Sequence, residues 1–516
     1  MILFAIIISS LLAILSHPTV IAGYVFPPLS FLAWIAYLPL FFVVVGQDYK
    51  TQFKRVFLFC FLFNGGVLHW LYIAMNQFGH LSPAASVLGL LILMAIFSLH
   101  FTLAFLLSRF FECRLRVPVF WSLPLLWVSA EWLRNCFPFK GYPWAQAGYS
   151  QAFHPALIQI ADLTGVYGIT ALILWVNLAV FEGVQFLRKQ VSLKQSIFRI
   201  SFVILLWGML WGYGQYRLIT LDPLIEKASK VKVALLQGNI SQDEKWLSSR
   251  AEAISKIYQR MTEAASSLGA ELTIWPEASY PHELALEDVE QLRRVGDFSV
   301  DVMIGAVTHS LFDRLSIQNS AFLLHPDQTL GGAYHKQHLV PYGEYVPLRN
   351  FLPFLEKLTA QVGDFSPGKA YTLLHSGSAQ IGSLICYEDI FPEIARGHVL
   401  QGANLLVNIS NDAWYGNSSA LPQHLSYSPF RSVENRRSLV RATNTGITAT
   451  FDPLGRLQKV LVPFQRDILI DAMALMTQKT FYVKWGDVFS YFCIALTLIM
   501  FILALCRKKA PIKSNL

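Results

Sequence analysis

The chain has 516 residues, of which 54% are hydrophobic and only 14% are charged. An average soluble domain is about 25% charged, so this composition excludes a disordered or fibrous protein and disfavours an ordinary water-soluble enzyme. Six cysteines in a chain of this length do not indicate a disulfide framework.

Eight apolar stretches divide the chain. A helix needs about 20 apolar residues to cross the hydrocarbon core of a bilayer, and irregular backbone cannot face lipid. We therefore predict a polytopic membrane domain with seven transmembrane helices in residues 1–220 and an eighth within 486–507. The first stretch lacks a basic head and a small-residue cleavage site, which predicts an uncleaved helix. The stretches are 2–16, 19–46, 56–74, 83–108, 119–133, 156–182, 197–214 and 488–506.

Basic residues gather in alternate connections between these segments. Loops rich in Lys and Arg remain in the cytoplasm, so both termini are predicted to be cytoplasmic, with 508–516 as a basic tail. The net charge of +8 is then largely topological, and no nucleic-acid partner is expected. The basic residues are Lys50, Lys54, Arg55, Arg109, Arg114, Arg116, Arg188, Lys189, Lys194, Arg199, Arg507, Lys508, Lys509 and Lys513.

The region between the seventh and eighth segments, 230–476, is predicted to be an outward-facing α/β domain. It contains short apolar runs, each closed by polar residues or Gly and Pro, a pattern typical of buried strands. Helical patterns lie between some of these runs, which indicates a layered α/β architecture. The runs are 231–236, 272–275, 302–306, 321–324, 381–386 and 405–409.

Three predicted strands end in groups that carry chemistry. Glu277 follows the run at 272–275, Lys336 follows a strand ending near Tyr334, and Cys386 ends the run at 381–386. Functional residues collect where the strands of such sheets end. A carboxylate, an ammonium and a thiol could therefore converge on one site.

Cys386 is the only cysteine of the outward domain. Outward compartments normally pair cysteines, so a lone thiol there favours a nucleophile, although a small buried hydrophobe is the alternative. A thiol with a pKa of about 8.5 needs a base at neutral pH. Glu277 is the candidate base; its alternative role is to cap a helix or pair with an arginine.

Lys336 supplies fixed positive charge that would favour a thiolate and hold an oxyanion. A solvated surface lysine is the alternative. His335 and His338 are rivals, since Cys-His pairs are a frequent nucleophile design, and the residue pattern does not choose between them. The two histidines do not match a zinc-ligand spacing, so no metal is expected.

The outward domain resembles the carbon–nitrogen hydrolase (nitrilase) superfamily, whose catalytic set is Glu, Lys and Cys in that chain order. The resemblance implies an α-β-β-α sandwich and selects Lys336 over the two histidines. The matching motifs are Ile274-Trp275-Pro276-Glu277, Tyr334-His335-Lys336 and Ile385-Cys386-Tyr387-Glu388.

Nearly the whole chain resembles the apolipoprotein N-acyltransferases of bacterial inner membranes. The resemblance implies that Cys386 takes an acyl chain from a phospholipid, at the sn-1 position of phosphatidylethanolamine. The thioester then passes it to the α-amine of the diacylglyceryl-cysteine of an apolipoprotein. It also implies a monomer without a cofactor, with its catalytic domain in the periplasm. Further matching segments are Gly141-Tyr142-Pro143-Trp144, Gln237-Gly238-Asn239-Ile240, Lys245-Trp246, 341–347, 411–416 and 441–446.

The resemblance also assigns supporting positions. Glu344 would orient Lys336 or assist proton transfer, and Glu388 would pair with Lys336 or a nearby backbone group; structural ion pairs are the alternative for both. Trp246 and Tyr387 are predicted to bind substrate, Trp246 from a mobile arm over the site, with plain packing as its alternative role. Three residues are interpreted as forming structural salt bridges: Arg431, Glu434 and Arg441.

Two other functions remain open on the residues alone. The first is a membrane-tethered amidase or nitrilase that hydrolyses a small amide with the same three side chains. The second is a non-enzymatic transporter or sensor. Transport would place ionisable residues in the middle of the membrane, whereas Glu131 and Asp162 lie near segment ends.

Overall fold

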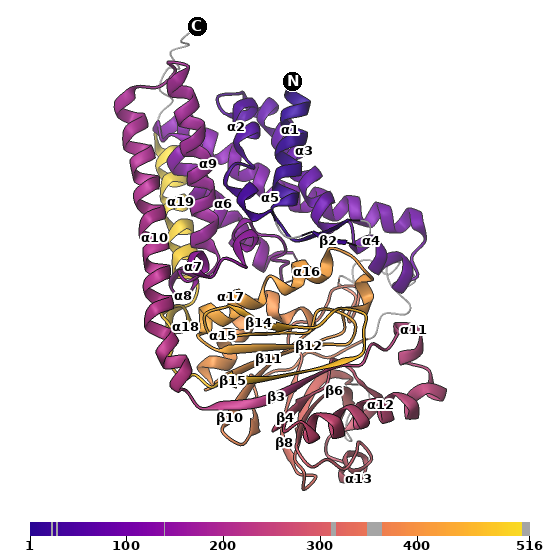
Figure 1. The fold of residues 1–516 in the computed structure, drawn as a ribbon. Helices are drawn as coiled ribbons and strands as arrows, with labels where there is room; N and C mark the ends of the chain where they lie inside the picture. The colour runs from indigo at the N-terminus through magenta and orange to yellow at the C-terminus, as the bar shows by residue number, and fades with distance from the viewer. Residues whose placement is uncertain (22–23, 27–28, 139, 311–315, 348–363, 508–516) are drawn as a thin grey trace.

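The structure is a computed structural model. It describes residues 1–21, 24–26, 29–138, 140–310, 316–347 and 364–507, so the predicted basic tail at 508–516 lies outside the described residues. The chain forms two parts (Figure 1). Apolar helices from the first half of the chain, joined by the last helix, lie above two β-sheets formed by the second half.

Helix caps explain where several helices of the first part begin. The Asp48 carboxylate accepts hydrogen bonds from the backbone of Lys50 and Thr51 at the start of α3, and Ser82 caps α5 in the same way. The longer helices are α1 (Ile2–Leu15), α2 (Leu38–Val44), α3 (Tyr49–Leu68), α5 (Pro83–Leu115), α6 (Val119–Cys136), α9 (Tyr167–Leu187), α10 (Leu193–Lys227) and α19 (Val488–Cys506). The short elements are β1 (Thr19–Ile21), β2 (Tyr24–Phe26), η1 (Ser30–Trp34), α4 (Leu71–Ile73), η2 (Ala74–Phe78), η3 (Ala147–Gln151), α7 (Pro155–Ile158) and α8 (Ala161–Thr164).

Within the described ranges, four helices are long and apolar enough to cross a bilayer: α5, α9, α10 and α19. Helix α3 and the following Leu71–Phe78 would make a fifth span, bent by 62° at a short break. Two further apolar helices, Ile2–Leu15 and Ser30–Val44, are shorter. Several apolar helices are thus present as expected, but the predicted count of eight spans is not confirmed.

The largest difference from the prediction lies at 19–46, where one continuous helix was expected. The described residues there form the β1–β2 hairpin, then η1 and α2. Three prolines fall within this stretch, Pro27, Pro28 and Pro39. Proline lacks the backbone N–H that a helix interior requires, whereas a hydropathy pattern responds only to the apolar side chains.

The second part contains two mixed sheets whose central strands are parallel. The seven-stranded sheet has the order β15-β3-β4-β6-β7-β8, with β5 paired to β6, and the six-stranded sheet has the order β14-β13-β12-β11-β10-β9. All six predicted strands are confirmed, in β3, β4, β6, β7, β10 and β11. The strands of the first sheet are β3 (Lys230–Gln237), β4 (Leu272–Ile274), β5 (Tyr280–Ala285), β6 (Asp301–His309), β7 (Gln318–Leu324), β8 (Leu330–His335) and β15 (Asp467–Ala474). Those of the second are β9 (Leu374–Ser376), β10 (Ala379–Ile385), β11 (Leu405–Ser410), β12 (Ser438–Thr443), β13 (Ala449–Phe451) and β14 (Leu457–Val460).

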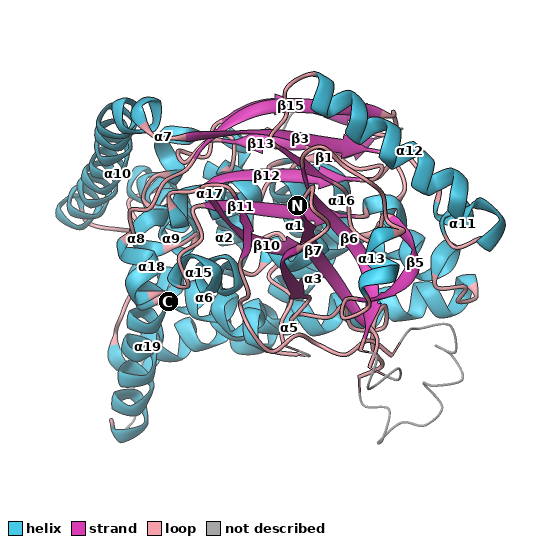
Figure 2. Ribbon diagram, turned by 90° about the horizontal axis from the view of Figure 1, so that it is seen from below, coloured by secondary structure: helices cyan, strands magenta, loops and turns pink. Residues whose placement is uncertain are grey.

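Helices cover the outer faces of the two stacked sheets. Seen from below, the strands of the two sheets form neighbouring layers (Figure 2). Helix α12 packs on β3 and β4, whereas α15 and α17 pack on β10 and β12 and lie between the six-stranded sheet and the membrane-type helices. The helices of this part are α11 (Gln242–Lys245), α12 (Ser248–Ser267), α13 (Val289–Arg293), η4 (Cys386–Ile390), α15 (Pro392–Leu400), η5 (Asp412–Tyr415), α16 (Ala420–Leu425), α17 (Ser428–Asn435) and α18 (Phe481–Trp485).

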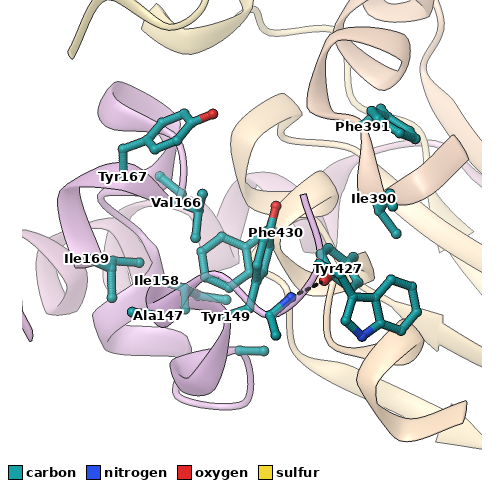
Figure 3. Packing of buried hydrophobic residues seen from close by; sticks show 14 of the residues in the cluster. Ala147, Tyr149, Ile158, Val166, Tyr167, Ile169, Ile390, Phe391, Tyr427 and Phe430 are labelled. Carbon is teal, nitrogen blue, oxygen red and sulfur yellow. Dashed lines mark hydrogen bonds between the residues drawn. The ribbon is translucent and has the colours of Figure 1, made fainter. Parts of the chain in front are cut away.

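Buried contacts join the helical part to the sheets. Figure 3 shows Tyr149 of η3 against the rings of Tyr427 and Phe430, with ring centroids 4.2 and 4.8 Å apart. Charged groups also cross this junction: Arg436 Nη2 lies 2.6 Å from Asp162 Oδ2. Because these groups are buried, the helices fix the position of the sheets rather than tethering them loosely.

Candidate active site

The three predicted catalytic residues follow the ends of three strands. Glu277 comes three residues after β4, Lys336 directly after β8, and Cys386 directly after β10, at the first position of η4. The first two strands belong to the seven-stranded sheet and the third belongs to the other sheet. The site is therefore assembled across both sheets.

Glu277 and Lys336 lie in contact within a small polar cluster. Lys336 Nζ is 3.4 Å from Glu277 Oε1 and 2.9 Å from Glu344 Oε1. The side-chain amide of Asn319 donates to the same two oxygens, at 2.8 and 3.1 Å. The backbone N–H of Asn411 donates to Glu277 Oε2 at 2.9 Å. These donors hold the Glu277 carboxylate in one orientation.

The surroundings keep Lys336 charged. The side chain is 1% exposed, and burial alone would lower its pKa. The carboxylates of Glu344 and Glu277 act in the opposite direction, and the net effect raises the pKa of Lys336 above its usual range. A fixed ammonium therefore stands beside the candidate base.

Cys386 is a buried thiol that requires a base. Its exposed fraction is 5%, and burial raises its pKa well above the ordinary value, with the Glu277 charge adding to the rise and Lys336 opposing it. Its φ of 56° lies in the left-handed region, which is costly for a residue with a Cβ. The Asn408 side-chain amide donates to the Cys386 carbonyl at 2.8 Å and helps to hold this turn.

Glu388 forms hydrogen bonds with backbone groups on both sides of the site. Its carboxylate accepts hydrogen bonds from the backbone N–H groups of Gln337, His338 and Ile385, and from the Tyr334 hydroxyl. These bonds connect the loop that carries Lys336 to the strand end that carries Cys386. Of the two predicted kinds of partner, the structure places backbone groups in hydrogen-bond contact with Glu388.

The two remaining predicted residues differ in exposure. Tyr387 is buried, its hydroxyl donates to the Leu339 carbonyl at 2.8 Å, and its ring centre lies 5.7 Å from Lys336 Nζ. Trp246 follows α11 and is 52% exposed. An exposed tryptophan does not fit the packing alternative, whereas the substrate-binding roles of both residues remain predictions.

The rival histidines have other environments. His335 Nδ1 lies 2.7 Å from Ser320 Oγ, and the His338 ring stacks on Phe391 with centroids 3.7 Å apart. Burial lowers the pKa of both, that of His338 to about 3. Neither ring has a hydrogen bond to Glu277 or to Cys386 within the described part of the chain, whereas Lys336 is in direct contact with Glu277. Among the described residues, no group of three or more His, Cys, Asp or Glu is arranged to hold a metal ion.

Arg441 forms the salt bridges that the sequence predicted, but its partners, in a buried charge network near Cys386, were missed by sequence reasoning. Arg441 lies 2.8 Å from Asp389 and 2.9 Å from Asp412, and His424 lies between the same two carboxylates, at 2.8 and 3.2 Å. The Ser410 hydroxyl donates to Asp412 Oδ1 at 2.7 Å. The Asn-Asp pair at the end of the 405–409 run was the available signal. Arg431 and Glu434 form the expected buried pair, at 2.8 Å.

Each of the two parts of the chain matches the model of a known protein family. The model of the carbon–nitrogen hydrolases matches residues 232–480, which places the sheet-containing part in that class of proteins. The model described as the apolipoprotein N-acyltransferase N-terminal domain matches residues 9–179, in the helical part.

Relatives that match most of the chain identify a more specific family. The chain is 38% identical over 505 residues to the apolipoprotein N-acyltransferase of Geobacter metallireducens, covering 96% of this chain and 95% of that protein. The Nitrosomonas europaea protein of the same name is 34% identical, covering 85% of each chain. The solved cysteine-to-alanine mutant of the amidase from Nesterenkonia sp. AN1 is 17% identical with a TM-score of 0.38, covering 52% of this chain and 98% of that one. The chain belongs to the apolipoprotein N-acyltransferase family, as the sequence motifs indicated.

Proposed function

We propose that this protein transfers an acyl chain from a phospholipid, through a thioester on Cys386, to the α-amine of the N-terminal diacylglyceryl-cysteine of a lipoprotein. The observation that carries the proposal is the contact of Glu277 with Lys336, at 3.4 Å, beside a buried thiol whose pKa both residues shift. The donor that we propose is the sn-1 chain of phosphatidylethanolamine.

In the first stage, Glu277 accepts the proton of Cys386, and the thiolate attacks the ester carbonyl of the phospholipid. Lys336 and a backbone N–H near Cys386 stabilise the oxyanion. The intermediate collapses, the lysophospholipid oxygen leaves with the proton from Glu277, and the acyl chain stays on sulfur. Splitting the transfer in this way replaces one difficult step by two easier ones.

In the second stage, the neutral α-amine attacks the thioester carbonyl and Glu277 accepts its proton. The second tetrahedral intermediate collapses to an amide as the C–S bond breaks, and Glu277 returns the proton to the departing sulfur, which restores the thiol of Cys386. Burial of Cys386 supports a thioester that survives until the amine arrives, because a site that excludes water protects the thioester from hydrolysis.

We propose a membrane arrangement with eight apolar segments, seven in 1–220 and one in 486–507, and with a catalytic domain at 230–476 in the periplasm of a bacterial inner membrane. Both termini would be cytoplasmic. The basic residues at the C-terminal ends of α5 and α19 support this arrangement, because Arg114 Nη1 donates to the Arg507 carbonyl at 2.9 Å. Two clusters assigned to the cytoplasm thus lie on the same side of the molecule.

The alternatives are separable by experiment. Purified protein would be given phosphatidylethanolamine and a diacylated lipopeptide, and Cys386 would be analysed by mass spectrometry for one added acyl chain. We expect acyl-Cys386 and then triacylated peptide, and neither product with Cys386→Ala. Cleavage of a small amide without acyl transfer would favour an amidase, and normal transfer by Cys386→Ala would refute the mechanism. The transporter alternative would need ionisable residues free to bind a transported solute. Glu131 instead accepts a hydrogen bond from Thr170, and Asp162 pairs with Arg436, so both carboxylates already have structural partners.

A further inference from the structure

We propose that Lys245 is a positioning residue of this reaction: a second buried ammonium that anchors Glu277 through its main-chain carbonyl and balances the negative charge of the intermediates. The inference rests on the proposed function, since it assumes that Glu277 and Cys386 exchange a proton during acyl transfer.

The first observation is where α11 touches Glu277. Lys245 Nζ donates to the main-chain carbonyl of Glu277 at 3.0 Å. At the other end of the same helix, Gln242 accepts a hydrogen bond from the side chain of Asn411 at 2.9 Å, and the backbone N–H of Asn411 donates to Glu277 Oε2. This one-turn helix therefore contacts both the backbone of Glu277 and the residue that orients its carboxylate.

The second observation is the direction of the Lys245 side chain. Lysines normally keep the ammonium in water and are almost never fully buried without a charged partner. Lys245 is 3% exposed, whereas the next two residues, Trp246 and Leu247, are 52% and 51% exposed. Burial lowers the pKa of Lys245 to about 8, while the charges of Glu277 and Cys386 favour its protonated form. A buried lysine that faces these two groups carries a cost that a solvated lysine would avoid.

The third observation is the balance of charge. Lys336 is in contact with Glu344, and Arg441 is in contact with Asp389 and Asp412. Lys245, by contrast, has a neutral carbonyl as its hydrogen-bond partner among the described residues. Its charge remains available when Glu277 has taken the proton and the oxyanion carries the negative charge.

The charged groups that face these atoms are few and identifiable. Lys245 faces Glu277 and Cys386, and its Nζ lies 5.8 Å from the Trp246 ring centre. On its own helix, Asp243 and Glu244 are the acidic residues, and Glu244 pairs with Arg250 at 3.2 Å. The titratable groups that interact with Cys386 include, besides Lys245, Glu277, Lys336, Asp412, Tyr415 and Arg441.

The test uses the purified full-length protein and two readouts at Cys386. The first is the rate of alkylation of Cys386 by iodoacetamide at about pH 7, where Lys245 is mostly protonated, followed on the peptide that contains this cysteine. The second is the rate of acyl-Cys386 formation from phosphatidylethanolamine. The variants are Lys245→Met, which removes charge and donor, Lys245→Gln, which keeps a donor, and Lys245→Arg, which keeps the charge. Lys256→Met, at an exposed lysine of α12, is the matched control.

We expect Lys245→Met and Lys245→Gln to slow both alkylation and acylation of Cys386 about tenfold, the effect of a rise of one unit in the pKa of the thiol at fixed pH. Lys245→Arg should retain an alkylation rate close to that of the parent, and Lys256→Met should not change that rate. A purely structural role of Lys245 would lower thermal stability without changing the alkylation rate.

Two results would overturn the inference. One is an alkylation rate for Lys245→Gln, or for Lys245→Met, equal to that of Lys256→Met. The other is an equal loss of rate in the Met and Arg variants, since the charge would then have no part. Failure of the parent protein to form acyl-Cys386 would instead refute the proposed function, so the two failures are distinguishable.

Discussion

The ammonium of Lys336 lies closer to Glu344 than to Glu277: the N–O distances are 2.9 and 3.4 Å. Glu344 also accepts a hydrogen bond from the backbone N–H of Val340 at 2.9 Å, so its position is fixed from a second direction. This pairing leaves Glu277 less tightly bound to the lysine, and hence freer to accept a proton.

Replacing Glu344 by Gln should therefore slow acylation of Cys386. Without the Glu344 charge, Lys336 is drawn towards Glu277 and competes with the proton for its carboxylate. We expect a loss of about tenfold, corresponding to about 1.4 kcal/mol, in single-turnover formation of acyl-Cys386. Glu252→Gln removes an exposed carboxylate on α12 and serves as the control. An acylation rate equal to that of the control would show that Glu344 is only a structural partner.

Glu277→Gln tests the base directly. The amide oxygen can still accept from Asn319, so the pocket should keep its shape, but the side chain can no longer take a proton. General-base catalysis contributes about 10²- to 10⁴-fold, and acylation should fall by that amount. Thermal unfolding midpoints of the variant and the parent should agree, which separates loss of the base from loss of the fold. Acylation at the rate of the parent would assign proton transfer to another group.

Trp246→Ala tests the predicted substrate contact. The ring is 52% exposed, so its removal should change the stability of the fold little. Transfer of the acyl chain should fall about tenfold if the ring contacts a lipid chain, because burial of a large apolar side chain is worth about 1.5–3 kcal/mol. Leu268→Ala, at an exposed position after α12, is the control. The rate of triacylated peptide formation is the measurement, and equal rates in both variants would leave Trp246 without this role.

The strands and the three strand-end residues could be predicted because both depend on local sequence. An apolar run that ends in a polar residue reports a buried strand and its exit point together, as at Cys386 after β10. The breaks in the membrane segments were not predicted, because hydropathy does not register the backbone effect of a proline such as Pro39.

Contacts between distant residues were also beyond the sequence. Asp389 and Arg441 are 52 positions apart and meet only when β12 lies beside β11. The inward direction of Lys245 was equally hidden, because a one-turn helix is too short for a periodic pattern to identify its buried face.

Because the His338 ring is buried against Phe391, we expect the stability of the protein to decrease at acidic pH. Burial lowers the pKa of His338 from 6.5 to about 3, with Lys140 and Lys336 adding to the effect. Below pH 6.5 the unfolded chain binds a proton that the folded chain does not, so the free energy of unfolding should fall by about 1.4 kcal/mol per pH unit. His338→Phe keeps an aromatic ring on Phe391 and should remove this part of the pH dependence. The measurement is the thermal midpoint of each protein at about pH 7 and about pH 5. His375→Phe, at an exposed histidine, is the control. An equal fall of the midpoint in the parent and both variants would contradict the prediction.

Arg441 should be essential for stability because it neutralises two buried carboxylates. All three side chains are fully buried, and Arg441 also donates to Asn408, whose amide holds the Cys386 carbonyl. Arg441→Met leaves His424 as the one remaining basic group in contact with Asp389 and Asp412 among the described residues, and breaking a buried pair in this way costs about 3–5 kcal/mol. Adding Asp412→Asn should recover part of the loss, since one uncompensated charge is removed. Unfolding midpoints followed by tryptophan fluorescence provide the measurement, with Arg260→Met on the exposed side of α12 as control. A double variant no more stable than Arg441→Met would show that packing, rather than charge, accounts for the loss.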